Sequence, residues 1–237
     1  MGQKLPIGIQ SFEDLRNKGF LYVDKTALVY KLVTEGKYYF LSRPRRFGKS
    51  LLLNTLESYF QGKRELFNGL AIAELEKDWM EYPILHLDLN TRNYSAKESL
   101  VAELNKHLEF WEAKYGDVYR ERSIEERFTQ VIRLAYEKTG RQVVILVDEY
   151  DKPLLQAIGN AELQDAYRAT LKGFYGALKS MDGCIRFAFL TGVTKFGKVS
   201  VFSDLNNLED ISFLDMVLGL TNHIAITLFI EKWLNLT

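Results

Sequence analysis

Apolar residues along this chain gather in short runs that predict strands. Such runs lie at residues 38–41, 84–89, 143–147 and 185–190, separated by longer polar stretches. The run at 84–89 alternates between apolar and polar residues, as a half-buried strand does. The run at 143–147 is Val-Val-Ile-Leu-Val, which is β-branched and does not alternate. This composition is typical of a strand buried on both faces of a parallel sheet.

Between these runs, apolar residues recur at three- and four-residue spacing, which predicts amphipathic helices. Ser11 and Asp24 precede two short helices as candidate N-caps, and Ser123 with Glu126 forms a capping box. Because strands and helices alternate, we expect an α/β fold with a parallel sheet sandwiched between helices. Helices are expected at residues 12–17, 25–34, 51–60, 100–115, 124–139 and 162–180.

The loop after the first expected strand has the sequence RPRRFGKS, at residues 43–50. A strand, a tight loop and a helix are the context of a phosphate-binding loop, and they predict a P-loop NTPase fold. Lys49 is expected to reach the β- and γ-phosphates, and Ser50 to hold Mg²⁺ through its hydroxyl. Arg43 stands where the motif has a glycine, the residue best able to take a positive φ. The residues expected to contact the nucleotide are Arg45, Arg46, Phe47, Gly48, Lys49, Ser50 and Leu51.

Two carboxylates, Asp148 and Glu149, directly follow the most apolar strand. In open parallel sheets, ligands bind at the carboxyl ends of the strands. Asp148 is therefore expected to hold Mg²⁺ together with Ser50. Glu149 is expected to orient and deprotonate an attacking water. With the loop at 43–50, these residues predict the two-part site of a nucleotide hydrolase.

Other positions near these motifs have two interpretations. Thr191, at the end of the fourth strand, is the candidate for sensing the γ-phosphate, with Thr194 second; the alternative is a turn residue bound to local backbone. Arg45 and Arg46 either stabilise the transferred phosphoryl group or face outward and pair with acids. Asp151 is more simply explained as the N-cap of a helix with an early proline.

The composition restricts the partners and the compartment. Among the 237 residues, 31 basic and 31 acidic residues give no electrostatic argument for nucleic acid or a membrane as a partner. Cys184 is the single cysteine, so an intramolecular disulfide or a cysteine-based zinc site is excluded. No signal-peptide pattern and no run of about 18 apolar residues is present. We expect a cytoplasmic protein.

Several stretches, in order, resemble the bacterial AAA-ATPase-like family, P-loop ATPases related to AAA+, STAND and archaeal-type ATPases. The resemblance covers roughly residues 5–220 and implies ATP and Mg²⁺ as ligands. It implies that Lys49 and Ser50 bind nucleotide and metal, that Asp148 binds the metal and that Glu149 acts in hydrolysis. Arginine at position 43 is usual in this family. The similar stretches are YVDKT at 22–26, the loop at 43–50, LFNGL at 66–70, DEYDKPL at 148–154, LTGV at 190–193 and SDLNNL at 203–208.

The resemblance also suggests how the chain is divided. Residues 1–36 are expected to form a helical extension packed on the core, residues 37–220 the P-loop ATPase domain, and residues 221–237 a divergent tail. Members of the family commonly continue into a helical region and a PD-(D/E)XK nuclease-like domain. Here we expect a truncated or frame-shifted chain that stops before the helical lid.

Two functions follow from these observations. The first is a Mg²⁺-dependent protein that binds and hydrolyses ATP, as the motor or switch module of a larger protein. The alternative is a nucleotide-binding switch or interaction module with little or no turnover. A homo-oligomer or a partner protein is expected in either case, and no motif in the sequence distinguishes ATP from GTP.

Overall fold

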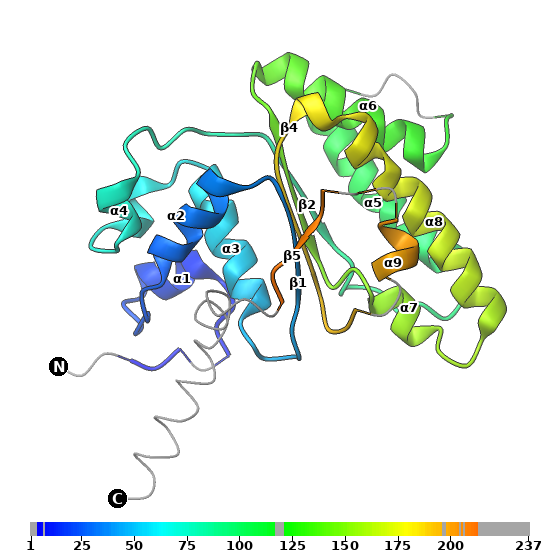
Figure 1. The fold of residues 1–237 in the computed structure, drawn as a ribbon, viewed down its shortest axis with the longest axis horizontal. Helices are drawn as coiled ribbons and strands as arrows, with labels where there is room; N and C mark the ends of the chain where they lie inside the picture. The colour runs from blue at the N-terminus through cyan, green and yellow to red at the C-terminus, as the bar shows by residue number, and fades with distance from the viewer. Residues whose placement is uncertain are drawn as a thin grey trace, which may run out of the picture.

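The computed structural model describes residues 4–6, 8–116, 121–195, 198–203, 205 and 207–212. In this part of the chain, a twisted sheet stands between two groups of helices (Figure 1). Five parallel strands form the sheet in the order β2-β3-β4-β1-β5. Their bounds are β1 Tyr38–Ser42, β2 Ile84–Asp88, β3 Val143–Asp148, β4 Ile185–Gly192 and β5 Glu209–Asp210.

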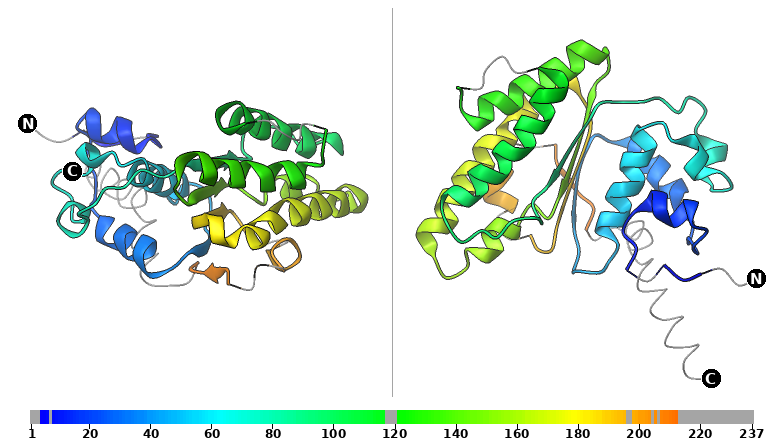
Figure 2. Two further views of the ribbon diagram at one scale, coloured as in Figure 1. Left: turned by 90° about the horizontal axis from the view of Figure 1, so that it is seen from above. Right: turned by 180° about the vertical axis from the view of Figure 1, so that it is seen from behind.

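The helices divide between the two faces of the sheet, as Figure 2 shows from two further directions. One face is covered by α1 Phe12–Asn17, α2 Thr26–Glu35, α3 Lys49–Phe60, the 3₁₀ turn η1 Arg64–Phe67 and α4 Ile72–Leu75. The other is covered by α5 Glu98–Tyr115, α6 Ile124–Thr139, α7 Lys152–Gln156, α8 Ala161–Ser180, η2 Asp182–Cys184 and α9 Lys198–Val201.

Each face of the sheet has its own hydrophobic core. In β1, Tyr38 and Phe40 belong to the core under α5, α6 and α8, whereas Tyr39 and Leu41 belong to the core under α2 and α3. Residues 143–147 of β3 alternate between the two cores in the same way. Both faces of these strands are therefore buried, which explains why their sequences are continuously apolar.

The expected α/β fold with a parallel sheet between helices is confirmed. The capping box of α6 is present: the Ser123 hydroxyl accepts from the amide of Glu126, whose carboxylate accepts from the Ser123 amide. The short elements α4, α9 and β5 were not expected. Residues 213–237, and with them the expected tail at 221–237, lie outside the described residues. None of the described helices has the length and apolar character needed to cross a bilayer.

The YVDKT stretch at residues 22–26 binds the two residues that directly follow the LFNGL stretch at 66–70. Asp24, just before α2, accepts a hydrogen bond from the amide of Ala71 at 2.7 Å, and the Thr26 hydroxyl accepts one from the amide of Ile72 at 3.0 Å. Arg16 on α1 donates to two carbonyl groups in and just after η1. These contacts fix the start of α2 against α4, beside the helix that follows the 43–50 loop.

A buried carboxylate fastens the loop after β2 to α5. Glu103 is 1% exposed and accepts hydrogen bonds from Thr91 at 2.8 Å, Arg92 at 2.8 Å and Lys106 at 3.1 Å. Burial alone would raise the pKa of the Glu103 carboxyl, but these hydrogen bonds and the charge of Lys106 outweigh burial and lower the pKa to about 2.

We expect Glu103 to stabilise the fold in a pH-dependent way. Because its folded-state pKa is lowered, its contribution is fully present above about pH 4.5 and is lost as pH falls toward 2. The free energy of unfolding of the wild type should exceed that of Glu103→Gln by roughly 2 to 3 kcal/mol at pH 7, and this difference should shrink below pH 4.5. Urea unfolding of both proteins between pH 7 and pH 2.5 measures it. A difference that stays constant with pH would contradict the assignment.

Candidate nucleotide-binding site

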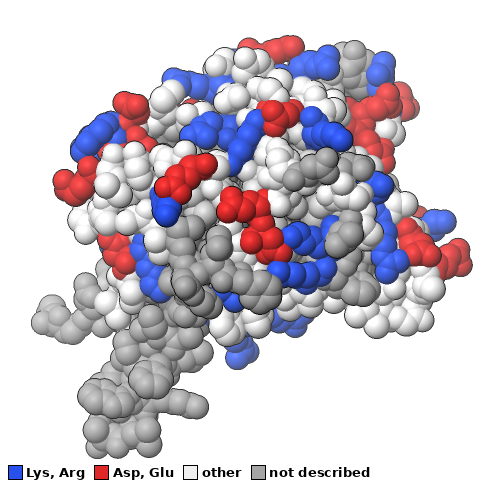
Figure 3. All heavy atoms as spheres, in the orientation of Figure 1, with Lys and Arg blue, Asp and Glu red and all other residues white. Residues whose placement is uncertain are grey.

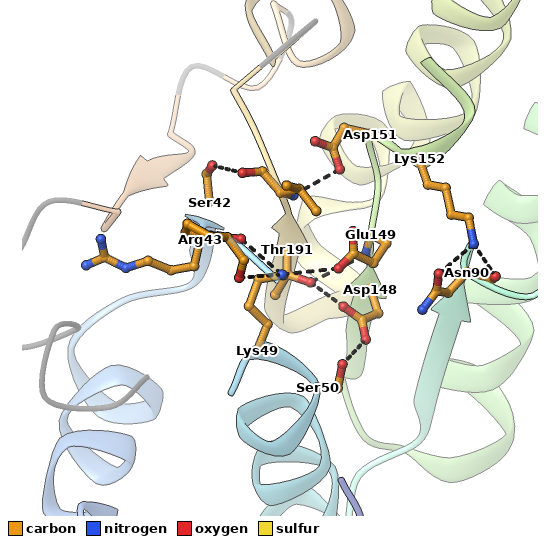
Figure 4. A network of polar contacts seen from close by, with 12 residues as sticks. Ser42, Arg43, Lys49, Ser50, Asn90, Asp148, Glu149, Asp151, Lys152 and Thr191 are labelled. Carbon is orange, nitrogen blue, oxygen red and sulfur yellow. Dashed lines mark hydrogen bonds and ion pairs between the residues drawn. The ribbon is translucent and has the colours of Figure 1, made fainter. Parts of the chain in front are cut away.

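The carboxyl ends of β1, β3 and β4 bring three distant stretches of sequence together (Figure 4). Strand β4 pairs with β1 on one side and with β3 on the other. Thr191, near the end of β4, therefore lies between the loop that follows β1 and the carboxylates at the end of β3. This order of strands sets the spacing of the groups that form the site.

The start of α3 presents hydrogen-bond donors that the described chain leaves unused. Gly48 is the N-cap of α3 and has a left-handed backbone, with φ of 77°. Within the described residues, the backbone N–H groups of residues 48–51 have no acceptor. Four unpaired N–H groups at the positive end of a helix form a binding place for an anion.

Lys49 follows Gly48 and is 4% exposed. Its ammonium lies 3.1 Å from the carboxylate of Glu149, and it donates to the carbonyl oxygens of Arg43 at 3.0 Å and Pro44 at 3.4 Å. Three acceptors from two parts of the chain thus compensate a nearly buried charge. The structure brings together the lysine and the glutamate that the sequence placed at one site.

Asp148 connects α3 with β4. One of its carboxylate oxygens accepts a hydrogen bond from the Ser50 hydroxyl at 2.7 Å, and the other accepts one from the Thr191 hydroxyl at 2.6 Å. Thr191 is fully buried, and its oxygen also lies 3.4 Å from the amide of Glu149. The Thr191 hydroxyl therefore orients Asp148, a role that the sequence did not indicate.

Glu149 has an unusual backbone and an unusual environment. Its φ is 56°, in the left-handed region that non-glycine residues rarely adopt. Burial raises the pKa of the Glu149 carboxyl, and the negative charges of Asp148 and Asp151 raise it further. The positive charge of Lys49 lowers this pKa but does not cancel the effect of burial. Strained backbone and a shifted pKa often occur together at functional sites.

The arginine at position 43 is compatible with the geometry of the loop. The residues with positive φ in the loop are Arg46, at 67°, and Gly48, and Arg43 is not among them. Arg43 contributes its carbonyl oxygen to Lys49, while its side chain points away from the site (Figure 4). A glycine is therefore not required at this position.

The other residues expected to contact a nucleotide differ in their exposure. Arg45 and Arg46 are exposed, and neither forms an ion pair with the described residues. Phe47 is half-buried. The Leu51 side chain belongs to the core under α2 and α3, so only its backbone N–H is available to a ligand.

Asp151 has a role that the sequence did not reveal. Its side chain is fully buried and does not cap α7, although the residue occupies the N-cap position. It accepts hydrogen bonds from the amides of Val193 at 3.1 Å and Thr194 at 2.7 Å, and from the Thr194 hydroxyl at 2.8 Å. Asp151 thus holds the loop after β4 beside the site, and Thr194, the second candidate sensor, is part of that contact.

The oxygen atoms of Ser50 and Asp148 fit Mg²⁺. This ion prefers oxygen ligands and is commonly bound through one or two protein groups, with water and phosphate oxygens completing its coordination. Among the described residues, no cluster of three or more His, Cys, Asp or Glu side chains is arranged to hold a metal by itself. A hydroxyl and a carboxylate 2.7 Å apart are the donor set expected for a metal that is shared with phosphates.

A parallel sheet between helices, with a Gly-Lys-Ser loop after one strand and an Asp-Glu pair after another, defines a P-loop NTPase-like fold. The comparison with protein families agrees: the chain belongs to the AAA-ATPase-like family, described as "Predicted AAA-ATPase", which matches residues 6–202. Membership of this family supports ATP binding in general.

A relative from Azotobacter chroococcum mcd 1, described as "Uncharacterized protein in vnfD 5'region", is 42% identical to this chain over 212 residues. The match covers 89% of this chain and 41% of the relative, so the chain spans about two fifths of that protein's length. No solved structure matches the chain.

Gly192, at the end of β4, has no room for a side chain. A Cβ atom there would lie 2.5 Å from the Tyr150 ring and 2.8 Å from Asp151. We expect Gly192→Ala to lower the free energy of unfolding by about 1 to 3 kcal/mol. Gly176→Ala, in the middle of α8 with nothing within 4 Å of the added atom, should raise it by about 0.5 to 1 kcal/mol. Urea unfolding tests both, and equal stability of the two variants would contradict the close contact.

Proposed function

We propose that this chain is a Mg²⁺-dependent ATPase domain. The observation that carries the proposal is the shared geometry of Lys49, Ser50, Asp148 and Glu149, which links a phosphate-binding helix start to two carboxylates. ATP binding is supported by the family, and hydrolysis and Mg²⁺ are inferred from the residues. We further propose a motor or switch role within a longer protein, a homo-oligomer or partner protein, and a cytoplasmic location.

In the proposed binding step, the N–H groups of residues 48–51 and the Lys49 ammonium bind the β- and γ-phosphates. Because Lys49 contacts Glu149 in this structure, phosphate oxygens would take the place of that carboxylate. Ser50 and Asp148 would hold Mg²⁺, which neutralises charge on the transferred phosphoryl group when bound. Thr191 keeps the Asp148 carboxylate oriented for that contact.

In the proposed hydrolytic step, Glu149 accepts a proton from a water that attacks the γ-phosphorus. The new bond joins the water oxygen to phosphorus, and the bond from phosphorus to the oxygen of ADP breaks, which gives ADP and inorganic phosphate. The raised pKa of Glu149 makes its carboxylate a stronger base than an exposed one. The exposed Arg45 and Arg46 are available to stabilise charge on the phosphates.

A second candidate function is a nucleotide-binding switch with little or no turnover. The contact that favours it is the ion pair of Glu149 with Lys49. If Glu149 kept this partner when nucleotide bound, it would not be free to activate water. Turnover by the unmodified chain distinguishes the two functions.

Two substitutions separate binding from hydrolysis. Lys49→Ala removes the phosphate-binding ammonium and should weaken ATP binding at least tenfold, with no measurable hydrolysis. Glu149→Gln should retain ATP binding but slow hydrolysis by about a hundredfold or more, because a general base contributes at least that factor. Calorimetric titration and phosphate release measure these effects. The matched control is Glu137→Gln, an exposed position on α6, which should leave both unchanged. Hydrolysis by Glu149→Gln at the wild-type rate would exclude Glu149 as the base.

Thr191 is expected to act through Asp148. Thr191→Val has the same shape but leaves one oxygen of the Asp148 carboxylate without its donor, whereas Thr191→Ser keeps the hydroxyl. The valine variant should need about ten- to a hundredfold more Mg²⁺ for half-maximal ATP hydrolysis, and the serine variant should resemble the wild type. Equal Mg²⁺ dependence in the two variants would contradict a role in orienting the metal ligand.

A further inference from the structure

A narrow cavity lies between the start of α2 and the start of α3. Its walls include Tyr22 and Lys25, from the segment that leads into α2, and Gly48, Leu51 and Thr55, from the 43–50 loop and α3. Its volume is about 20 Å³, which is room for about one water molecule. The cavity adjoins the start of α3, whose first N–H groups have no acceptor in the described part of the chain.

Among the described side chains that line this cavity, that of Lys25 has no polar partner. The Tyr22 hydroxyl is hydrogen-bonded with Thr55. The Lys25 side chain, by contrast, makes no hydrogen bond or ion pair with any part of the chain that the structure describes. This side chain is half-buried, and burial lowers the pKa of its ammonium.

The position of Lys25 is unfavourable for the fold by itself. A partly desolvated ammonium without a counter-charge is destabilising, and the N-terminus of α3 adds the positive end of a helix dipole nearby. An anion at the start of α3 would relieve both effects, because it would interact with the ammonium and with the free N–H groups of residues 48–51 together.

The neighbours of Lys25 hold it in this place. Asp24 and Thr26 both accept hydrogen bonds from the amides that begin α4. Asp24 also accepts from the Thr26 amide and hydroxyl, at 2.8 and 2.7 Å. The backbone on each side of Lys25 is therefore anchored, while the lysine side chain remains unpaired beside Gly48. Because the residues on both sides of Lys25 are anchored, its ammonium is preorganised to contact a ligand.

We propose that Lys25 binds the phosphate chain of the nucleotide, as a second lysine beside Lys49. The inference rests on the proposed nucleotide binding and adds to it a contact from outside the loop and the two strand ends. Within the YVDKT stretch at residues 22–26, Asp24 and Thr26 then fix the start of α2, while Lys25 contacts the ligand.

The test compares Lys25→Met with the wild type and with Lys31→Met. Lys31 lies on α2, the helix that Lys25 precedes, but its side chain is 53% exposed, and its ion-pair partner among the described residues is Glu35, at 3.7 Å. Binding of a non-hydrolysable ATP analogue with Mg²⁺, and of inorganic tripolyphosphate, is measured by calorimetric titration. Thermal unfolding without ligand is measured in parallel.

We expect Lys25→Met to bind both ligands about tenfold more weakly, since a hydrogen bond to a charged group is lost. Its unfolding temperature should equal or exceed that of the wild type, because the unpaired charge is removed. Lys25→Arg, which keeps the charge, should restore most of the affinity, and Lys31→Met should change neither quantity.

Three results would overturn the inference. They are wild-type affinity in Lys25→Met, a loss confined to the ATP analogue and absent with tripolyphosphate, or a loss of affinity accompanied by a lower unfolding temperature. A wild-type chain that binds neither ligand would instead refute the proposed function itself, so the two failures are distinguishable.

Discussion

The rest of the site depends on the two hydrogen bonds that the Asp148 carboxylate accepts. One oxygen accepts from the hydroxyl of Ser50 on α3, and the other accepts from the hydroxyl of Thr191 on β4. The next residue, Glu149, forms an ion pair with Lys49, which begins α3. Strands β1 and β3 are not neighbours, because β4 lies between them. Two strand spacings, roughly 10 Å, therefore separate the ends of β1 and β3. The side chains of Lys49, Ser50 and Thr191 bridge this distance and fix the loop relative to the sheet.

Much of the fold could be predicted because its signals are local. The strands with both faces buried had to be continuously apolar, and the Gly-Lys-Ser loop and the Asp-Glu pair each lie directly after such a strand. Strand β5 gave no such signal: it is two acidic residues long, and Asp210 is held by ion pairs with Lys195 and Lys198. Charges of this kind are typical of an exposed turn, and only tertiary contacts place them in a sheet.

The residues that the sequence did not reveal act through long-range contacts. Asp151 binds amides more than 40 positions away, and Asp24 anchors α2 to an amide 47 positions away. The place of the Lys25 side chain beside Gly48, without a polar partner among the described residues, becomes visible only in the folded chain. The roles of Lys49, Ser50, Asp148 and Glu149 in hydrolysis, and the division of the chain at residues 36 and 220, stay predictions, because neither the fold nor family membership tests them.

The ion pair between Lys49 and Glu149 has a consequence for the proposed chemistry. The charge of Lys49 lowers the pKa of Glu149, against the effect of burial. Phosphate oxygens that bind Lys49 would take that charge away from Glu149 and bring negative charge close to it, so both changes would raise the affinity of the carboxylate for a proton. A divalent cation at Ser50 and Asp148 would oppose this rise and keep Glu149 ionised. In this proposed arrangement, phosphate binding would make Glu149 a stronger base, and a cation held by Ser50 and Asp148 would supply the positive charge that keeps the Glu149 carboxylate ionised.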